Sequence, residues 1–190
     1  MNDYVFRPMT AAETELWYRT ELAEAFPPQE RKPLPDILRM MAEARYAVWG
    51  LWEGDALLGY AALWSRPGVP LVLLDYLGVT AARRNGGLGG HILQRLKEQG
   101  IPLVLESELP VGDGGDPIRL RRIAFYERCG FVPLYVMATC GMAWQALVSD
   151  PAPGREAIMA AHRALYGPER RDVCIPLPPG QTPEKPYWEA

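Results

Sequence analysis

The pattern of apolar and polar positions along this chain predicts a mixed set of strands and helices. Strand-like patterns occupy residues 4–8, 45–52 and 56–64, and the turn sequence Glu53-Gly54-Asp55 joins the last two. Residues 69–79 are nearly all apolar, as a central strand covered on both faces would be. Three more strands are expected over residues 101–108, 131–136 and 142–148.

Helical patterns separate these strands. Thr10 and Glu13 match a capping box, which predicts a helix start there, and Pro27-Pro28 predicts its end near Phe26. The element order is then βααβββαβαββ, followed by one more helix. The remaining helices are expected over residues 36–44, 91–98, 119–129 and 155–166.

The chain changes character beyond residue 150. Residues 1–150 are interpreted as one domain, and residues 151–190 as a C-terminal helix with an extended tail packed on or next to it. Residues 175–190 hold five prolines and no periodicity, so this tail lies on the body or stays mobile. Tyr187 and Trp188 are candidates to dock it.

Composition narrows the class of protein. The 190 residues are 48% hydrophobic, enough for the core of one ordinary domain. A formal net charge of −3 argues against nucleic-acid binding, and no apolar run reaches the ~18 residues of a membrane span. The N-terminus lacks the pattern of a secretory signal, and three cysteines without metal-like spacing indicate reduced thiols, so we expect a cytoplasmic protein. With two histidines, no metal site is expected.

The most informative segment is the glycine-rich turn Arg84-Asn85-Gly86-Gly87-Leu88-Gly89-Gly90, which follows a predicted strand and opens a predicted helix. Glycines let the backbone turn sharply and approach a ligand closely. The first amides of a helix have no internal partners, and the positive end of the helix dipole adds to their attraction for anions. A phosphorylated ligand is therefore expected here.

Two familiar phosphate motifs do not fit this turn. The dinucleotide fingerprint needs a glycine where Ile92 stands, and the phosphate loop of nucleotide hydrolases needs a Gly-Lys-Ser/Thr sequence that is absent. The spacing Arg84-x-x-Gly87-x-Gly89, preceded by Leu77-x-Val79, resembles the acetyl-coenzyme A signature of the GNAT superfamily of N-acetyltransferases. A second block, residues 124–131 with sequence AFYERCGF, resembles the Phe-Tyr-Glu-x-x-Gly-Phe element of the same family.

This resemblance covers roughly residues 3–148 and implies an α/β (α+β) fold, with a mixed, mostly antiparallel central sheet flanked by helices. The segment 25–33 is similar to a recurring one in poorly characterised bacterial members. The resemblance implies an enzyme that transfers acetyl from acetyl-coenzyme A to a primary amine in a ternary complex. The cofactor contacts that it implies are Leu77, Gly78, Val79, Arg84, Asn85, Gly86, Gly87, Leu88, Gly89 and Gly90.

The resemblance makes Tyr126 the general acid that protonates the departing thiolate; the alternative is a tyrosine packed beside Phe125. A phenol with a pKa of ~10 and a thiol near ~8.5 make this transfer feasible. A carboxylate, alone or through a water chain, can deprotonate the amine, and Glu106 is the favoured base. Asp75, inside a very apolar strand, and Glu108 are alternatives, as is water without a dedicated base.

The acceptor is expected to be a small-molecule or peptide amine. The carboxylates of Glu106, Glu108, Asp113 and Asp116 favour a cationic amine, unless they only form a solvated loop. Arg119 stands where the family usually has an asparagine. The sheet edge and the C-terminal extension offer surfaces for a homodimer. The alternatives are a non-catalytic module that binds coenzyme A or a protein, and a nucleotide-phosphate enzyme.

Overall fold

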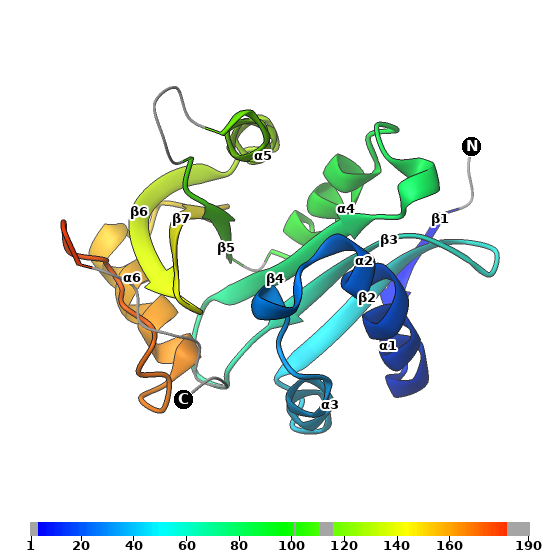
Figure 1. Ribbon diagram of the computed structural model, residues 1–190, viewed down its shortest axis with the longest axis horizontal. Helices are drawn as coiled ribbons and strands as arrows, with labels where there is room; N and C mark the ends of the chain where they lie inside the picture. Colours follow the sequence, from blue (N-terminus) through cyan, green and yellow to red (C-terminus); the bar gives the residue numbers. More distant parts are fainter. Residues whose placement is uncertain (1–3, 101, 111–115, 182–190) are drawn as a thin grey trace. The chain divides into compact units, whose positions relative to one another are not determined.

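The computed structural model describes residues 4–100, 102–110 and 116–181, and the chain forms two compact units. The first unit comprises residues 1–67 and 74–100, and the second comprises residues 68–73 and 101–190. The strands follow the order β1-β2-β3-β4 in the first unit and β5-β7-β6 in the second (Figure 1). The described pairs β1–β2, β2–β3, β5–β7 and β6–β7 are antiparallel, which confirms the predicted mixed, mostly antiparallel α/β class.

The first unit holds most of the helices. Its strands are β1 (Tyr4–Pro8), β2 (Tyr46–Glu53), β3 (Ala56–Trp64) and most of β4 (Val72–Val79). Its α-helices are α1 (Ala11–Trp17), α2 (Ala23–Ala25), α3 (Leu34–Ala42) and α4 (Leu88–Lys97). Shorter turns are the π-helix η1 (Tyr18–Leu22) and the 3₁₀ helices η2 (Pro28–Glu30) and η3 (Ala81–Arg83).

The predicted capping box is present at the start of α1. The Thr10 hydroxyl accepts a hydrogen bond from the Glu13 amide, and the Glu13 carboxylate accepts one from the Thr10 amide at 2.8 Å. The helical path continues through η1 and α2 and ends at Phe26, whose backbone is extended before Pro27, as predicted. The π-helical turn in the middle was not predicted.

Helices cover both faces of β3. Successive side chains of a strand point to opposite faces. A Cβ at Gly59 would lie 2.9 Å from the Ile92 side chain on α4, while the next residue, Tyr60, places its ring 5.3 Å from that of Trp17 on α1. Therefore α1 and α4 lie on opposite faces of this strand, and α4 is held against β3.

The second unit contains β5 (Leu103–Glu108), α5 (Pro117–Arg128), β6 (Val132–Thr139), β7 (Met142–Val148) and α6 (Arg155–Tyr166). The last helix has the bounds that the sequence predicts. The described part of the tail lies on the body, because the Cys174 amide donates to the Ala138 carbonyl at 2.9 Å and the Leu177 amide to the Val136 carbonyl at 2.9 Å.

Several predicted bounds differ from the structure, and some predicted residues lie outside it. The apolar run 69–79 forms a strand only from Val72, since Pro70 follows the turn at Pro67-Gly68 and cannot donate a ladder hydrogen bond. Helix α5 begins at Pro117, two residues earlier than expected, because Asp116 caps it by accepting from the Ile118 amide at 2.8 Å. Ile101, the loop 111–115 and residues 182–190 lie outside the described residues.

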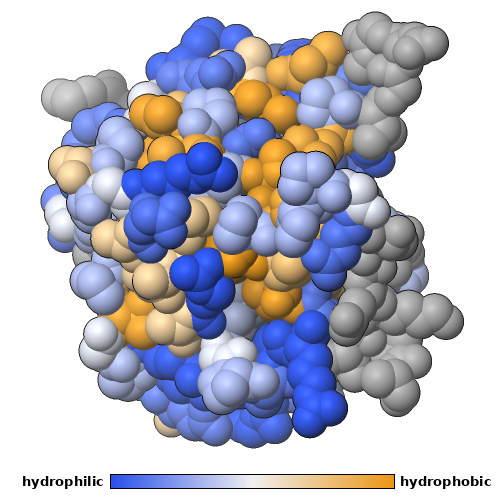
Figure 2. Space-filling view, turned by 90° about the vertical axis from the view of Figure 1, so that its left-hand side faces the viewer, coloured by the Kyte–Doolittle hydropathy of each residue, from blue (hydrophilic) through white to orange (hydrophobic). Residues whose placement is uncertain are grey.

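The surface of the described residues mixes polar and apolar groups, as Figure 2 shows for one face. None of the described helices is both long and apolar enough to span a bilayer. Apolar residues scattered singly on a surface are normal, and we base no interaction site on them. The large apolar side chains that stay exposed are Val5, Leu16, Ile118, Leu120 and Val132.

Candidate functional site

The glycine-rich turn forms an exposed N-terminus for α4 in the first unit. Gly87 is the N-cap residue, with φ 76° and ψ 0°, and Asn85 also has a positive φ, of 66°. A Cβ at Gly87 would have no atom within 4 Å, so internal packing does not demand a glycine there. Gly89 and Gly90 lie in the first helical turn, where each is ~1 kcal/mol less favourable than alanine. The backbone thus stays accessible at the end of the helix that attracts anions.

The turn contacts the end of β4, so predicted cofactor residues from two segments lie together. Arg84 Nε donates to the Val79 carbonyl at 3.4 Å, and Arg83 forms an ion pair with Glu53 at 2.9 Å. Backbone amides at a helix N-terminus attract anionic groups such as a pyrophosphate. The assignment of these residues to the cofactor stays a prediction.

Gly78 in β4 allows the Tyr60 side chain to approach the backbone closely. A Cβ at Gly78 would lie 2.3 Å from the ring and hydroxyl of Tyr60, which is 1% exposed. On the neighbouring strand, a Cβ at Gly59 would lie 2.9 Å from the Gly78 carbonyl. These two glycines let β3 and β4 approach closely, which agrees with the packing that a glycine inside a strand predicts.

Tyr126 lies on α5 in the second unit, with its ring 5.3 Å from that of Phe125 and 6.2 Å from that of Phe131. Burial raises the pKa of the Tyr126 phenol to about 12, and the charge of Arg122 partly offsets this rise. The phenol is therefore protonated at neutral pH. Full transfer of its proton to a thiolate would be uphill by roughly 5 kcal/mol, so in this state Tyr126 is better suited to donate a hydrogen bond.

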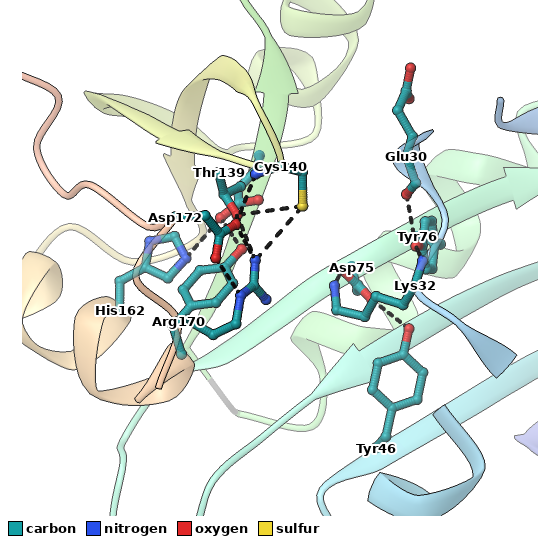
Figure 3. Close-up of polar contacts among 12 residues, drawn as sticks. Glu30, Lys32, Tyr46, Asp75, Tyr76, Thr139, Cys140, His162, Arg170 and Asp172 are labelled. Atoms are coloured by element: carbon teal, nitrogen blue, oxygen red, sulfur yellow. Dashed lines mark hydrogen bonds and ion pairs between the residues drawn. The ribbon is translucent and has the colours of Figure 1, made fainter. Parts of the chain in front are cut away.

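Asp75 belongs to a buried network in the first unit (Figure 3). Its Oδ1 lies 2.5 Å from Lys32 Nζ, and its Oδ2 accepts a hydrogen bond from the Tyr46 hydroxyl at 2.5 Å. The Lys32 ammonium also lies 5.0 Å from the ring centroid of Trp64. Because a lysine and a tyrosine hold both its oxygens, Asp75 has a structural role that explains a carboxylate inside an apolar strand.

The same network fixes the segment 25–33, whose sequence is similar to a recurring segment of bacterial family members. The Tyr76 hydroxyl accepts from the Lys32 amide at 2.8 Å and donates to the Glu30 carbonyl at 2.9 Å. The Phe26 ring packs edge-on against Tyr76 at 5.1 Å, and Tyr18 donates to the Lys32 carbonyl at 3.0 Å. The segment between α2 and α3 is thereby tied to β4.

Glu108 is held by arginines of α5. Arg119 and Arg122 each approach one of its carboxylate oxygens at 3.2 Å, and Arg119 also lies 3.6 Å from Asp116. Arg119, which replaces the usual asparagine of the family, therefore ties the start of α5 to the end of β5. Two of the four carboxylates expected to favour a cationic acceptor are balanced within the protein, and Asp113 lies outside the described residues.

Glu106 has different partners. Its side chain is 13% exposed, and its Oε1 accepts a hydrogen bond from the Tyr166 hydroxyl at 2.7 Å. The Nε2 of His162 lies 3.2 Å from the same oxygen. Both of these contacts come from side chains of α6.

A second buried ion pair lies near the C-terminus of the described chain (Figure 3). Arg170 donates to both carboxylate oxygens of Asp172 at 2.7 Å and to the Thr139 hydroxyl at 2.9 Å. Asp172 also accepts from the Cys140 amide at 3.1 Å, in the turn between β6 and β7. This network was not predicted, since its members are up to 33 residues apart and no local pattern links them.

Comparison with known proteins supports the interpretation of the sequence. Residues 12–131 match the acetyltransferase (GNAT) family. A relative from Bacillus subtilis (strain 168), YjbC, assigned to the acetyltransferases, is 34% identical over 113 residues, which cover 59% of this chain and 54% of that protein. The chain thus spans about half the length of this relative.

Solved structures share the fold. One, from Bacteroides thetaiotaomicron and assigned to the GNAT family, has a TM-score of 0.64 and 26% identity, and the match covers 83% of this chain and 94% of that one. A mutant of the spermidine N-acetyltransferase SpeG from Vibrio cholerae has a TM-score of 0.58 at 8% identity, covering 82% and 99% of the two chains. With the sequence match, the fold and the glycine-rich helix start in agreement, this chain belongs to the GNAT family of acetyltransferases.

Proposed function

We propose that this protein transfers acetyl from acetyl-coenzyme A directly to a primary amine in a ternary complex. The observation that carries this proposal is the helix start at Gly87, whose left-handed backbone leaves the amides of α4 accessible. The amides of residues 84–90 would hold the pyrophosphate, and the backbone of residues 77–79 would contact the pantetheine arm. The thioester then supplies the reactive acetyl group.

Two proton transfers in this reaction would involve side chains of the protein. Glu106 accepts the proton that the attacking amine must lose, because a lysine-like amine with a pKa of ~10.4 is mostly protonated at neutral pH. Tyr126 donates a hydrogen bond to the departing sulfur and protonates it as the carbon–sulfur bond breaks. Binding of the cofactor beside its ring would have to bring the phenol pKa down from about 12 for that transfer to be complete.

The acceptor is a small-molecule or peptide amine. The spermidine enzyme among the similar structures makes polyamines one class to test. The balanced charges of Glu108 and Asp116 remove part of the argument for a cationic acceptor. A homodimer and a cytoplasmic location stay predictions of the sequence.

The proposal is tested first by binding. Thermal melting is measured with acetyl-coenzyme A, coenzyme A, ATP and NADH in parallel; a ligand at about 100 times its Kd should add roughly 2.7 kcal/mol of stability. We expect stabilisation by the two coenzyme A forms and none by NADH or ATP. Preference for ATP would instead support a nucleotide enzyme.

Turnover is measured next as release of the coenzyme A thiol with polyamines, aminoglycosides and peptide N-termini. Tyr126→Phe should lower kcat by about 10²–10⁴-fold, the usual contribution of one acid or base, while leaving the melting shift with coenzyme A intact. Glu106→Gln should lower kcat/KM more than Glu108→Gln or Asp75→Asn does. Binding without turnover for any amine would favour a non-catalytic coenzyme A module.

A further inference from the structure

The C-terminal helix supplies two side chains to Glu106. Tyr166 donates a hydrogen bond to Glu106 Oε1 at 2.7 Å, and His162, one turn earlier on α6, places Nε2 3.2 Å from the same oxygen. All three residues lie in the second unit. Because α6 follows residue 131, where the match to the GNAT family ends, the family pattern does not account for these contacts.

His162 is held between Glu106 and a second tyrosine. Its side chain is fully buried, and the Tyr135 hydroxyl lies 2.8 Å from Nδ1. If Tyr135 donates to Nδ1, the imidazole proton is on Nε2, on the side of Glu106. At 3.2 Å, Nε2 is at ion-pair distance from the carboxylate but forms no hydrogen bond of good geometry with any described residue. A buried polar nitrogen without another described partner therefore faces the carboxylate.

The hydroxyls of Tyr135 and Tyr166 stay protonated and can therefore act as hydrogen-bond donors. Burial and the charge of Glu106 raise the pKa of both Tyr135 and Tyr166 well above 10, so neither loses its proton in the working range. Among the described residues, Arg163 acts on Tyr135, and the Arg170 guanidinium lies 5.0 Å from the ring centroid of Tyr166. The hydrogen bond that the Tyr166 hydroxyl donates to Glu106 favours the ionised form of this carboxylate.

We propose that His162 and Tyr166 are positioning residues that hold the Glu106 carboxylate in its ionised form, so that the C-terminal extension is part of the catalytic machinery. This inference rests on the proposed function, in which Glu106 is the base. Tyr166 fixes the position of the Glu106 carboxylate through a hydrogen bond of 2.7 Å. His162 contacts the same oxygen at 3.2 Å and limits its movement. Loss of the Tyr166 hydroxyl should make Glu106 easier to protonate.

NMR of the histidine ring tests the contact without any need for activity. The chain has two histidines, so His91→Gln leaves His162 as the single imidazole signal. In a Glu106→Gln background the ring proton and nitrogen shifts of His162 should change at constant pH, because its Nε2 lies 3.2 Å from that carboxylate. Glu108→Gln is the matched control and should leave these shifts unchanged, since Arg119 and Arg122 bind that carboxylate. Equal ring shifts in Glu106→Gln and in its parent protein would overturn the proposal.

The pH dependence of kcat/KM tests the role. Tyr166→Phe keeps the aromatic ring but removes the hydrogen bond to Glu106. The acid limb of the kcat/KM profile should therefore move to a pH that is higher by about one unit. The melting temperature of the variant is measured in parallel to check that it is folded. Tyr46→Phe is the matched control, because it removes another buried tyrosine–carboxylate hydrogen bond, that to Asp75. A shift in Tyr46→Phe but not in Tyr166→Phe would name Asp75 as the base and overturn the inference. Absence of wild-type turnover would overturn the proposed function itself, whereas turnover with an unmoved limb in Tyr166→Phe overturns only this step.

Discussion

Gly87 and Gly54 share a backbone conformation but differ in their surroundings. Both have a positive φ, of 76° and 57°, and neither would meet an atom within 4 Å if it carried a Cβ. Alanine at either position should therefore strain the backbone alike, by roughly 1–2 kcal/mol. Gly87 begins α4, whereas Gly54 lies in the turn between β2 and β3.

This pair separates backbone strain from ligand binding. Gly87→Ala should weaken acetyl-coenzyme A binding by about ten- to a hundredfold, because losing one hydrogen bond to a charged group amounts to roughly 1.5–3 kcal/mol. Gly54→Ala should keep the affinity of the wild type. Isothermal titration of both variants with acetyl-coenzyme A measures the difference, and equal affinities would show that the turn does not approach the cofactor.

At the scale of the element, the first helix carries a charge-dependent cap. Glu13 accepts hydrogen bonds from both terminal nitrogens of Arg7 and from the Thr10 amide, and these lower the pKa of its carboxyl to about 2. Since the folded pKa is below the unfolded value of 4.5, the stabilisation is complete above pH ~4.5 and is lost as the pH falls toward 2.

The pH dependence of the stability of Glu13→Gln tests whether this stabilisation is lost at low pH. The variant should be less stable than wild type near pH 6, and the difference in the free energy of unfolding should shrink between pH 4.5 and 2. Urea denaturation at four or five pH values measures it, with Glu15→Gln, on the same helix outside the capping box, as the control for a lost charge. A difference that persists at pH 2 would mean that the carboxylate charge is not its source.

Elements were predictable where the signals are local. Thr10 and Glu13 lie within one turn of helix, and Gly154 and Gly167, both with positive φ, bound α6 at the predicted ends. The order of elements followed from such signals. The π-helical turn at Tyr18–Leu22 has no comparable signature, and the start of β4 was shifted by the turn before it.

The partners of the candidate site were not predictable, because they are distant in sequence. Tyr166 is 60 residues from Glu106, and Lys32 is 43 residues from Asp75. The sequence did raise a question at Asp75, since a carboxylate in an apolar strand needs a partner, but it could not name Lys32. His162 gave no signal of its own: it is one polar residue on a helix face that packs into the core.

At the scale of the whole molecule, the family match and the compact units divide the chain differently. The match ends at residue 131, whereas the second unit includes β6, β7 and α6 and continues beyond them. The predicted domain boundary at residue 150 stays untested. It separates α6 from the strands that this helix packs on, because Tyr135 of β6 and Glu106 of β5 both contact it.

Truncation tests that boundary. Five large hydrophobic residues of the described chain beyond residue 150 are at most 6% exposed: Ile158, Met159, Leu165, Tyr166 and Ile175.

A chain that ends at Asp150 should lose cooperative unfolding and bind a hydrophobic dye. Truncating a single buried side chain of this kind costs about 2–5 kcal/mol, against a typical total stability of ~5–15 kcal/mol. A chain that ends at Gln181 keeps all the contacts named above and should still unfold cooperatively. If instead the chain ending at Asp150 melted cooperatively at the same temperature, α6 would be an appendage, and its contacts with Glu106 would be incidental to the fold of the second unit.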